Sequence, residues 1–408
     1  MGLVSVHIPV HPSHWIDDRG ETSVLGLIEV GRFIVGESGS GGYRNVIGVR
    51  VADGVEQPMT SQRWDGPLTP FMRIAWLADN SGVLVTGAEQ ESLHQIWYLA
   101  WPGDETRSLT DGLNGYEDIS LTADSGTLCA VRSDRIVNLW IAPNGEARGA
   151  RQITSGAGRE DGSRGISWTP DGKIVYHSTA GGNQNIWITE AGGAGNKQLS
   201  PQALQNQGPA VSPDGRYVVW ASWLGALGIW RMEIDGSNPK KLTNRAARSP
   251  HVSPDGKWLV YSHPNNIVFK IPIDGGDEVR LTDKPAGGAV ISPDGKLIAC
   301  NYQDEASRQF KIAIIPFEGG PPTRLFDLLG GPNRNLWWTP DGRAIAYIVT
   351  SNSVSNIWAQ PLAGGEPKPL TDFKDQRIFN FAWSRDGKQL ALSRGVVNSD
   401  VVLITNFR

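Results

Sequence analysis

Histidines near the N-terminus have the residue type and density expected of a metal site. His7, His11 and His14 lie within the stretch HIPVHPSH. Metal ligands must converge on one point, whereas positions 7 and 11 of an extended strand lie about 13 Å apart, at about 3.3 Å per residue. Pro9 and Pro12 oppose the helix that would bring the rings together. We therefore expect an exposed strand or tail here, with no metal bound.

The glycine-rich stretch at 36–44, GESGSGGYR, has the composition of a phosphate-binding loop. It lacks the G-x-x-x-x-G-K-[ST] spacing and a following helix, so we expect a loop between two strands.

The sequence contains no G-x-S-x-G nucleophile elbow and no set of protein-kinase motifs. Cys129 and Cys300 lie in the apolar runs TLCAV and LIACN, where packing is the expected role. We expect no cofactor.

Composition narrows the class of protein. With 39% apolar and 20% charged residues, the 408-residue chain can bury a sizeable core, and its 49 Gly and 26 Pro suit many tight turns. A net charge of −4 predicts no general attraction to nucleic acid. No apolar run approaches the roughly 18 residues needed to cross a bilayer, and the first residues lack the pattern of a signal peptide. These features do not assign the protein to a cellular compartment.

A turn containing aspartate recurs along the sequence and sets its organisation. Its eight aspartates are Asp79, Asp124, Asp171, Asp214, Asp255, Asp294, Asp341 and Asp386, spaced 39 to 47 residues apart. This period is typical of propeller blades with four strands each. In residues 166–200, four short β-favouring segments are separated by PDG, GGNQ and AGGAG. Pro presets φ, Asp can bond to the backbone beyond it and Gly accepts a positive φ, so each turn predicts a hairpin.

Tryptophans recur at one position of this pattern, the IW of the third strand. The tryptophans at this position are Trp97, Trp140, Trp187, Trp230 and Trp358. Aromatic residues that recur at a fixed position of the units are expected to pack one twisted sheet against the next.

We therefore predict an all-β fold, a single β-propeller of four-stranded antiparallel blades. Counting the turns gives eight blades, with seven or nine as alternatives. The prediction places one domain over 1–408, with a ring-closing segment at 1–30, a degenerate blade at 31–73 and eight SPDG-type repeats at 74–408. Because an unpaired blade edge invites aggregation, we expect residues 3–10 to pair with the strand at 400–406 and close the ring.

The repeated stretches AVSPDGRYVVWAS, HVSPDGKWLVYSH and VISPDGKLIACNY resemble the TolB-like, WD-type β-propeller repeat over about residues 74–408. More narrowly, GISWTPDGKIVY, GNQNIWI and the final SDVVLITNFR resemble the C-terminal propeller of bacterial membrane-bound serine/threonine protein kinases. The resemblance implies a sensor or protein-interaction domain, extracytoplasmic if it is the sensor part of a membrane receptor. It does not imply kinase activity in this chain.

Arginines recur in the loops that connect the fourth strand of one blade to the first strand of the next. These loops surround one end of a propeller's channel, and we predict a binding site there formed by Arg73, Arg164, Arg245, Arg248, His251, Arg334 and Arg377. Guanidinium groups bind carboxylate or phosphate with two parallel hydrogen bonds. The competing interpretation is ordinary solvated loop charge.

These features favour a non-catalytic, monomeric scaffold that binds a protein or peptide, with an acidic ligand as one possibility. The alternative is a propeller-type enzyme, such as a polysaccharide lyase or hydrolase, with acids, arginines and His251 lining the central funnel.

Overall fold

The computed structural model describes residues 29–407 apart from 31–32, 39–42, 51–54, 60–63, 66–72, 88–93, 112–113, 157–158, 201–204, 224–226 and 331–334. The chain divides into two compact units, one of Met1–Asp134 with Val397–Arg408 and one of Arg135–Val396. The division falls inside two long strands, β11 (Thr127–Pro143) and β34 (Gln389–Thr405), which belong to both units. Among the described residues the only helix is a 3-10 turn at Ala147–Gly149.

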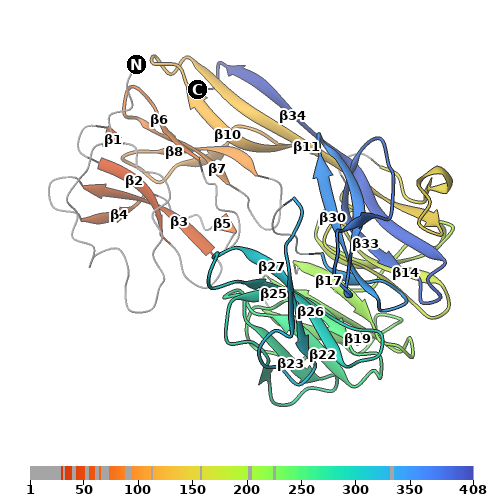
Figure 1. Cartoon of the computed structure of the whole chain (residues 1–408). Helices are drawn as coiled ribbons and strands as arrows, with labels where there is room; N and C mark the ends of the chain where they lie inside the picture. Colours follow the sequence, from red (N-terminus) through yellow and green to blue (C-terminus); the bar gives the residue numbers. More distant parts are fainter. Residues whose placement is uncertain are drawn as a thin grey trace. The chain divides into compact units, whose positions relative to one another are not determined.

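The unit of residues 135–396 contains five consecutive four-stranded antiparallel sheets (Figure 1). The first has β13 (Ile166–Trp168), β14 (Lys173–Ser178), β15 (Asn185–Glu190) and β16 (Lys197–Gln198). The second has β17 (Asn206–Val211), β18 (Tyr217–Ser222), β19 (Gly228–Glu233) and β20 (Lys240–Lys241). The third has β21 (Arg248–Val252), β22 (Trp258–Ser262), β23 (Val268–Pro272) and β24 (Val279–Arg280). The fourth has β25 (Ala286–Ile291), β26 (Leu297–Gln303), β27 (Phe310–Pro316) and β28 (Arg324–Phe326). The fifth has β29 (Trp337–Trp338), β30 (Ala344–Ser351), β31 (Val354–Pro361) and β32 (Lys368–Pro369).

A sixth sheet takes its strands from both ends of this unit. It runs β33 (Arg377–Trp383), β34, β11 and β12 (Arg151–Gln152). Residues 377–396 thus supply its first two strands, and residues 135–152 supply its last two. We call this the closing sheet, because its two halves join the end of the unit to its beginning.

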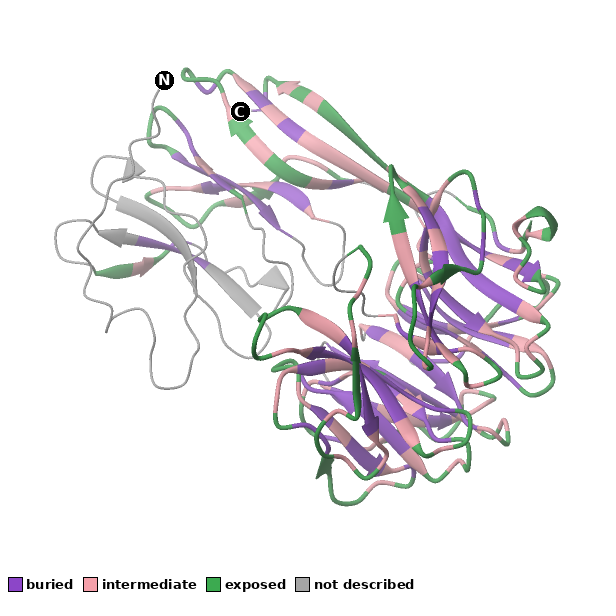
Figure 2. Cartoon of the chain, viewed as in Figure 1, coloured by how far each residue is buried: buried purple, intermediate pink, exposed green. Residues whose placement is uncertain are grey.

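Hydrophobic clusters join each of these sheets to the next and complete a ring. Phe381 and Leu390 of the closing sheet pack with Ala346 and Ile357 of the fifth sheet. On its other side, a second cluster joins the closing sheet to β13 and β14, and four more clusters fill the remaining junctions. Figure 2 shows buried residues concentrated in the strands of this unit. A fully buried Leu or Ile side chain contributes about 1.5–3 kcal/mol to folding, so the junctions account for much of the ring's stability.

Each recurring aspartate lies between the first two strands of its sheet, as the turn chemistry predicts. In the turn of β21 and β22, the Ser253 hydroxyl donates to Asp255 (2.5 Å), and Asp255 accepts from the backbone of Lys257 (3.1 Å). The same pair of bonds fixes the turns of Asp214, Asp294, Asp341 and Asp386.

Consecutive turns also contact one another. Gly215 has φ +75°, and a Cβ atom there would lie 2.9 Å from the ring of Pro170 in the preceding turn. Glycine at 215 therefore allows these two turns to pack closely.

Residues 29–134 and 397–405 form further antiparallel sheets. One contains β1 (Glu29–Val30), β2 (Phe33–Ser38), β3 (Tyr43–Arg50) and β4 (Glu56–Pro58), with β5 (Trp64–Asp65) pairing β3. A second contains β6 (Ile74–Trp76), β7 (Gly82–Gly87), β8 (Gln95–Ala100) and β9 (Thr106–Ser108). A third consists of β10 (Gly115–Leu121) with the first half of β11 and the last half of β34.

These findings confirm the all-β propeller fold but not the count of eight blades, since six sheets close the ring of residues 135–396. Closure there is made by residues 135–152, while the predicted closing segment 3–10 and the histidines at 7, 11 and 14 lie outside the described residues. The predicted single domain over 1–408, with its boundaries at 1–30, 31–73 and 74–408, stays a prediction. The glycine-rich stretch falls on β2, β3 and their connection at 39–42, which also lies outside the described residues.

Candidate binding site at one end of the ring

The first strands of the sheets line the channel of the ring. They contact one another around it: the Ser167 hydroxyl of β13 accepts from the backbone of Val211 in β17 (3.0 Å), and β17, β21 and β25 are likewise in contact. Because every sheet has the same strand order, these first strands run in the same direction and begin at the same end of the channel. We call this end the loop end, and the opposite end, with the Asp-Gly turns, the turn end.

Arg164 lies at the loop end, just before β13. Its exposed side chain contacts Gln207 at the start of β17 (3.3 Å). Surrounding protein lowers the pKa of Arg164, Glu160 raises it, and the neighbouring Arg135 lowers it. Arg135, on β11, reaches Glu160 (3.4 Å) and lies over the ring of Phe379 in β33 (5.8 Å). One carboxylate is thus shared by two guanidinium groups, and the cluster keeps a net positive charge.

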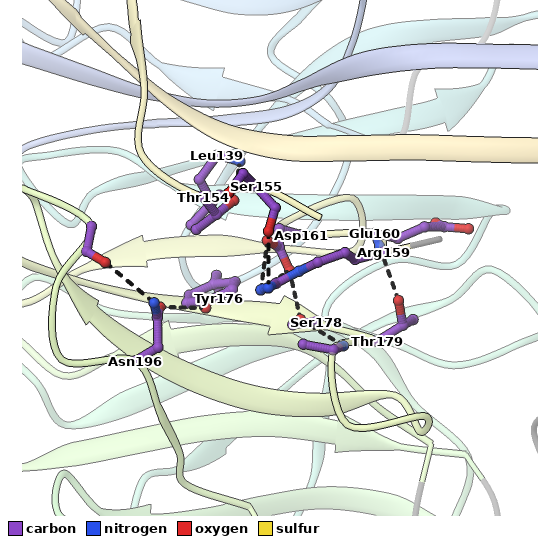
Figure 3. A network of polar contacts seen from close by, with 12 residues as sticks. Leu139, Thr154, Ser155, Arg159, Glu160, Asp161, Tyr176, Ser178, Thr179 and Asn196 are labelled. Carbon is purple, nitrogen blue, oxygen red and sulfur yellow. Dashed lines mark hydrogen bonds and ion pairs between the residues drawn. The ribbon is translucent and has the colours of Figure 1, made fainter. Parts of the chain in front are cut away.

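A buried aspartate fixes the loop that carries Arg164 (Figure 3). Asp161 is fully buried and accepts from the Ser178 hydroxyl (2.6 Å) and from Arg159 (2.9 Å). Its backbone carbonyl accepts from the Ser393 hydroxyl of β34 (2.7 Å). The backbone N–H of the preceding residue, Glu160, donates to the Thr179 hydroxyl (2.9 Å). The loop is therefore anchored to the first sheet and to the closing sheet.

Arg245 and Arg248 lie at the loop end beside β21. The Arg248 guanidinium stacks on the buried Trp223, with its carbon 4.6 Å from the ring centre. Arg245 is exposed and lies near His263. Burial lowers the pKa of His263, Glu278 beside it (3.7 Å) raises it, and Arg245 lowers it. The second sheet-to-sheet junction along the ring thus adds two cationic groups to the loop end.

Arg377 begins β33 and contacts the Ser353 hydroxyl of the fifth sheet (3.4 Å). The loop before it is held by a second charge pair, Arg394 with Asp375 (2.9 Å). Arg394 is only 4% exposed and lies against the rings of Trp140 and Phe373. Its charge is therefore paired with Asp375 and packed against the aromatic rings beside it.

His251 points into the channel. Its ring meets the edge of Trp337 in β29 (5.7 Å), two sheets further along the ring, and its Nδ1 accepts from the backbone of Ile291 in β25 (3.4 Å). A side chain that contacts both of these first strands must be directed toward the axis. Burial lowers the pKa of His251 to about 4, so the imidazole is neutral at physiological pH. His251 and Trp337 occupy the interior of the channel.

Arg385 lies at the turn end, where the closing sheet has Arg in place of the turn proline. It donates to the backbone carbonyls of Ser212 (2.8 Å) and Pro213 (2.6 Å), two sheets away along the ring. Burial lowers its pKa, whereas the charge of Asp214 raises it. This side chain therefore spans part of the turn end.

The structure thus brings Arg164, Arg245, Arg248 and Arg377 to one end of the ring, with His251 deeper in the channel. Arg73 lies in the other unit, where it pairs with Asp118 (2.5 Å), and Arg334 lies outside the described residues. Sequence reasoning did not single out Arg135. In the described part of the chain, no three His, Cys, Asp or Glu side chains gather as metal ligands.

This closed ring of four-stranded antiparallel sheets, with its loops around a central channel, defines a β-propeller. Residues 162–337 match the family described as TolB beta propeller domain. A solved TolB-type structure from Agrobacterium tumefaciens is similar with a TM-score of 0.51 and 20% identity, covering 64% of this chain and 99% of that one. TolB from Acinetobacter baumannii gives a TM-score of 0.43 and 13% identity over 91% of this chain and 80% of that one.

The fold is therefore that of a TolB-like β-propeller. No curated protein matches the sequence. Within the described residues, no helix is long and apolar enough to cross a membrane.

Proposed function

We propose that the ring is an interaction module that binds an acidic segment of a partner protein at its loop end. The observation that carries this proposal is the charge balance around Arg164, where the exposed guanidinium groups of Arg164 and Arg135 face the single carboxylate of Glu160. A carboxylate placed beside these groups would relieve their repulsion and form charge-assisted hydrogen bonds. A TolB-like propeller is a suitable scaffold, and the resemblance to kinase sensor propellers points to recognition rather than chemistry.

The other cations at the loop end extend the same surface. Arg245, Arg248 and Arg377 lie around the opening, on a chain whose net charge is −4. Positive groups gathered at a concave mouth focus a field that the overall charge conceals, and they speed the encounter with an acidic ligand. His251 and Trp337 limit how far a segment can enter, so the ligand is expected to lie across the mouth with a short part inserted.

A titration with a hexaglutamate peptide tests this proposal. The double variant Arg164→Ala/Arg248→Ala is expected to bind about tenfold more weakly than the wild type, since exposed ion pairs contribute up to about 1 kcal/mol each. Wild-type affinity is expected to fall with added salt. The matched control, Arg216→Ala/Lys257→Ala, removes two exposed cations from the turn end. Equal affinities for the two double variants would overturn the proposal.

A further inference from the structure

A groove of about 460 Å³ lies between the first and second sheets of the ring, away from the channel mouth. Its apolar lining comes from Ile188 of β15, Leu199 and Ile234. Four carboxylates and two lysines line it as well: Asp171, Glu190, Asp214 and Asp235, with Lys173 and Lys197. The shape and lining suit an elongated aliphatic group that ends in a positive charge.

The next two junctions of the same ring show one way in which this place is filled. The residue after the third-strand aromatic is Arg231 in the second sheet. Its guanidinium reaches the third sheet, where it donates to the carbonyl of Ile273 (3.1 Å) and the carboxylate of Asp274. It also lies over the ring of Tyr217 (4.1 Å). Only 13% of the Arg231 side chain is exposed, so at this junction the chain itself supplies a largely buried cation.

The next junction repeats the arrangement with lysine. Lys270 follows the aromatic of the third sheet and reaches the fourth, where it donates to the carbonyl of Phe317 (3.4 Å) and to Glu318 (2.5 Å). It lies over the rings of Trp258 and Phe317, and 4% of its side chain is exposed. In both junctions, a carbonyl and the carboxylate that follows it in the chain receive a cation from the preceding sheet.

At the first junction this cation is replaced by Ile188. The corresponding acceptors are the carbonyl of Ile234 and the carboxylate of Asp235. The turn that carries them is held as in the next sheet: Lys197 donates to the carbonyl of Asp235 (2.9 Å), as Lys240 donates to that of Asp274 (2.7 Å). Bonds from Ser237 lower the pKa of Asp235, so its exposed carboxylate is charged at neutral pH.

We propose that this groove receives a lysine or arginine side chain from a basic segment of a partner protein. The aliphatic stem lies on Ile188, Leu199 and Ile234, and the charged head reaches the Ile234 carbonyl and Asp235, as Arg231 does within the chain. The lysines of the groove are engaged: Lys173 pairs with Asp171 and Glu190, and Lys197 bonds to the turn. The charge of this ligand is opposite to that of the ligand proposed for the loop end, so the two proposals stand independently.

The test uses the full chain and an acetylated tri-arginine amide as the probe, with tri-citrulline as its neutral equivalent. Asp235→Asn is expected to weaken tri-arginine binding about tenfold, the loss of one charge-assisted bond. Asp274→Asn, the matched change at the next junction, is expected to leave it unchanged. Tri-citrulline is expected to bind too weakly to measure.

Ile188→Arg provides the reciprocal variant, because it introduces the cation found at the next two junctions. It is expected to abolish tri-arginine binding while the thermal unfolding temperature stays at or above that of the wild type. The loop-end double variant Arg164→Ala/Arg248→Ala should bind tri-arginine like the wild type. No binding by the wild type, or equal affinities for Asp235→Asn, Asp274→Asn and Ile188→Arg, would overturn the proposal.

Discussion

His177 and His251 are held in the neutral form inside the ring. His177, at the end of β14, is fully buried, and burial together with the charge of Arg164 lowers its pKa to about 3. Burial lowers the pKa of His251 to about 4. In the unfolded chain both would titrate near the ordinary value of 6.5. The unfolded state therefore binds protons first as the pH falls, and the folded state loses stability from about pH 6.5 downward.

The variant His177→Gln isolates one of these contributions, since glutamine does not titrate. Above pH 7 the wild type carries the full stability of a neutral imidazole. Below about pH 6.5 its advantage over His177→Gln is expected to shrink by up to about 1.4 kcal/mol per pH unit. Urea unfolding of both proteins between pH 8 and pH 5 measures the difference. Parallel stability curves would show that the ring does not hold His177 neutral.

For the individual binding residues, the sequence predicted which end of the ring they occupy but not which side chains they contact. The position of Arg164, Arg245, Arg248 and Arg377 at one end follows from the repeat, because equivalent loops of equivalent sheets share one end. Their neighbours do not follow from it. The approach of Arg135 to Glu160 and Arg164 depends on the path of β11 through the closing sheet.

The long strands β11 and β34 are where the repeat and the fold diverge. Each of their sequences, TLCAVRSDRIVNLWIAP and QLALSRGVVNSDVVLIT, forms a single strand of 17 residues. The other units have a turn-rich break between second and third strands, such as TAGGNQ at 179–184. That break is missing from TLCAVRSDRIVNLWIAP, which contains no Gly and no Pro before its last residue. Counting turns alone therefore gave eight blades, whereas pairing of β34 with β11 closes six sheets.

Gly395 lies where these two strands are in close contact. A Cβ atom at residue 395 would meet the backbone carbonyl oxygen and carbon of Ile136 and the Cα of Val137. Gly395→Ala is expected to destabilise the ring by about 3 kcal/mol, because backbone atoms must move to relieve the clash.

The control for this change is Gly192→Ala, since a Cβ atom at residue 192 would lie in open space. It should change the free energy of unfolding by no more than about 0.5 kcal/mol. Denaturant unfolding compares the two variants, and equal stabilities would mean that β11 and β34 do not meet at this glycine.

The features of whole elements that depend on local chemistry were well predicted. Each Asp-Gly turn joins the first two strands of its sheet, and the third-strand tryptophans Trp140, Trp187, Trp230 and Trp358 pack beside the clusters between sheets. The inter-sheet groove could not be predicted. It arises because Ile188 replaces a cation that crosses the next two junctions, and such crossing contacts are visible only once the sheets are assembled.

At the scale of the molecule, the ring of residues 135–396 carries both of the binding sites proposed above. Cationic side chains gather at the loop end, and carboxylates line the groove between the first and second sheets. The ion pairs Arg159–Asp161 and Arg394–Asp375 keep the loops of the closing sheet in place. Both surfaces depend on the ring being closed by strands from its two ends.

The most direct test of this account is the folding of the ring as a unit. A protein of residues 135–396 contains all six sheets, whereas one of residues 153–396 lacks the last two strands of the closing sheet and would expose the apolar faces of its neighbours. Urea unfolding followed by tryptophan fluorescence and circular dichroism should give one cooperative transition for 135–396, and none for 153–396. Failure of 135–396 to fold, or equal stability of the two proteins, would contradict closure of the ring by residues 135–152.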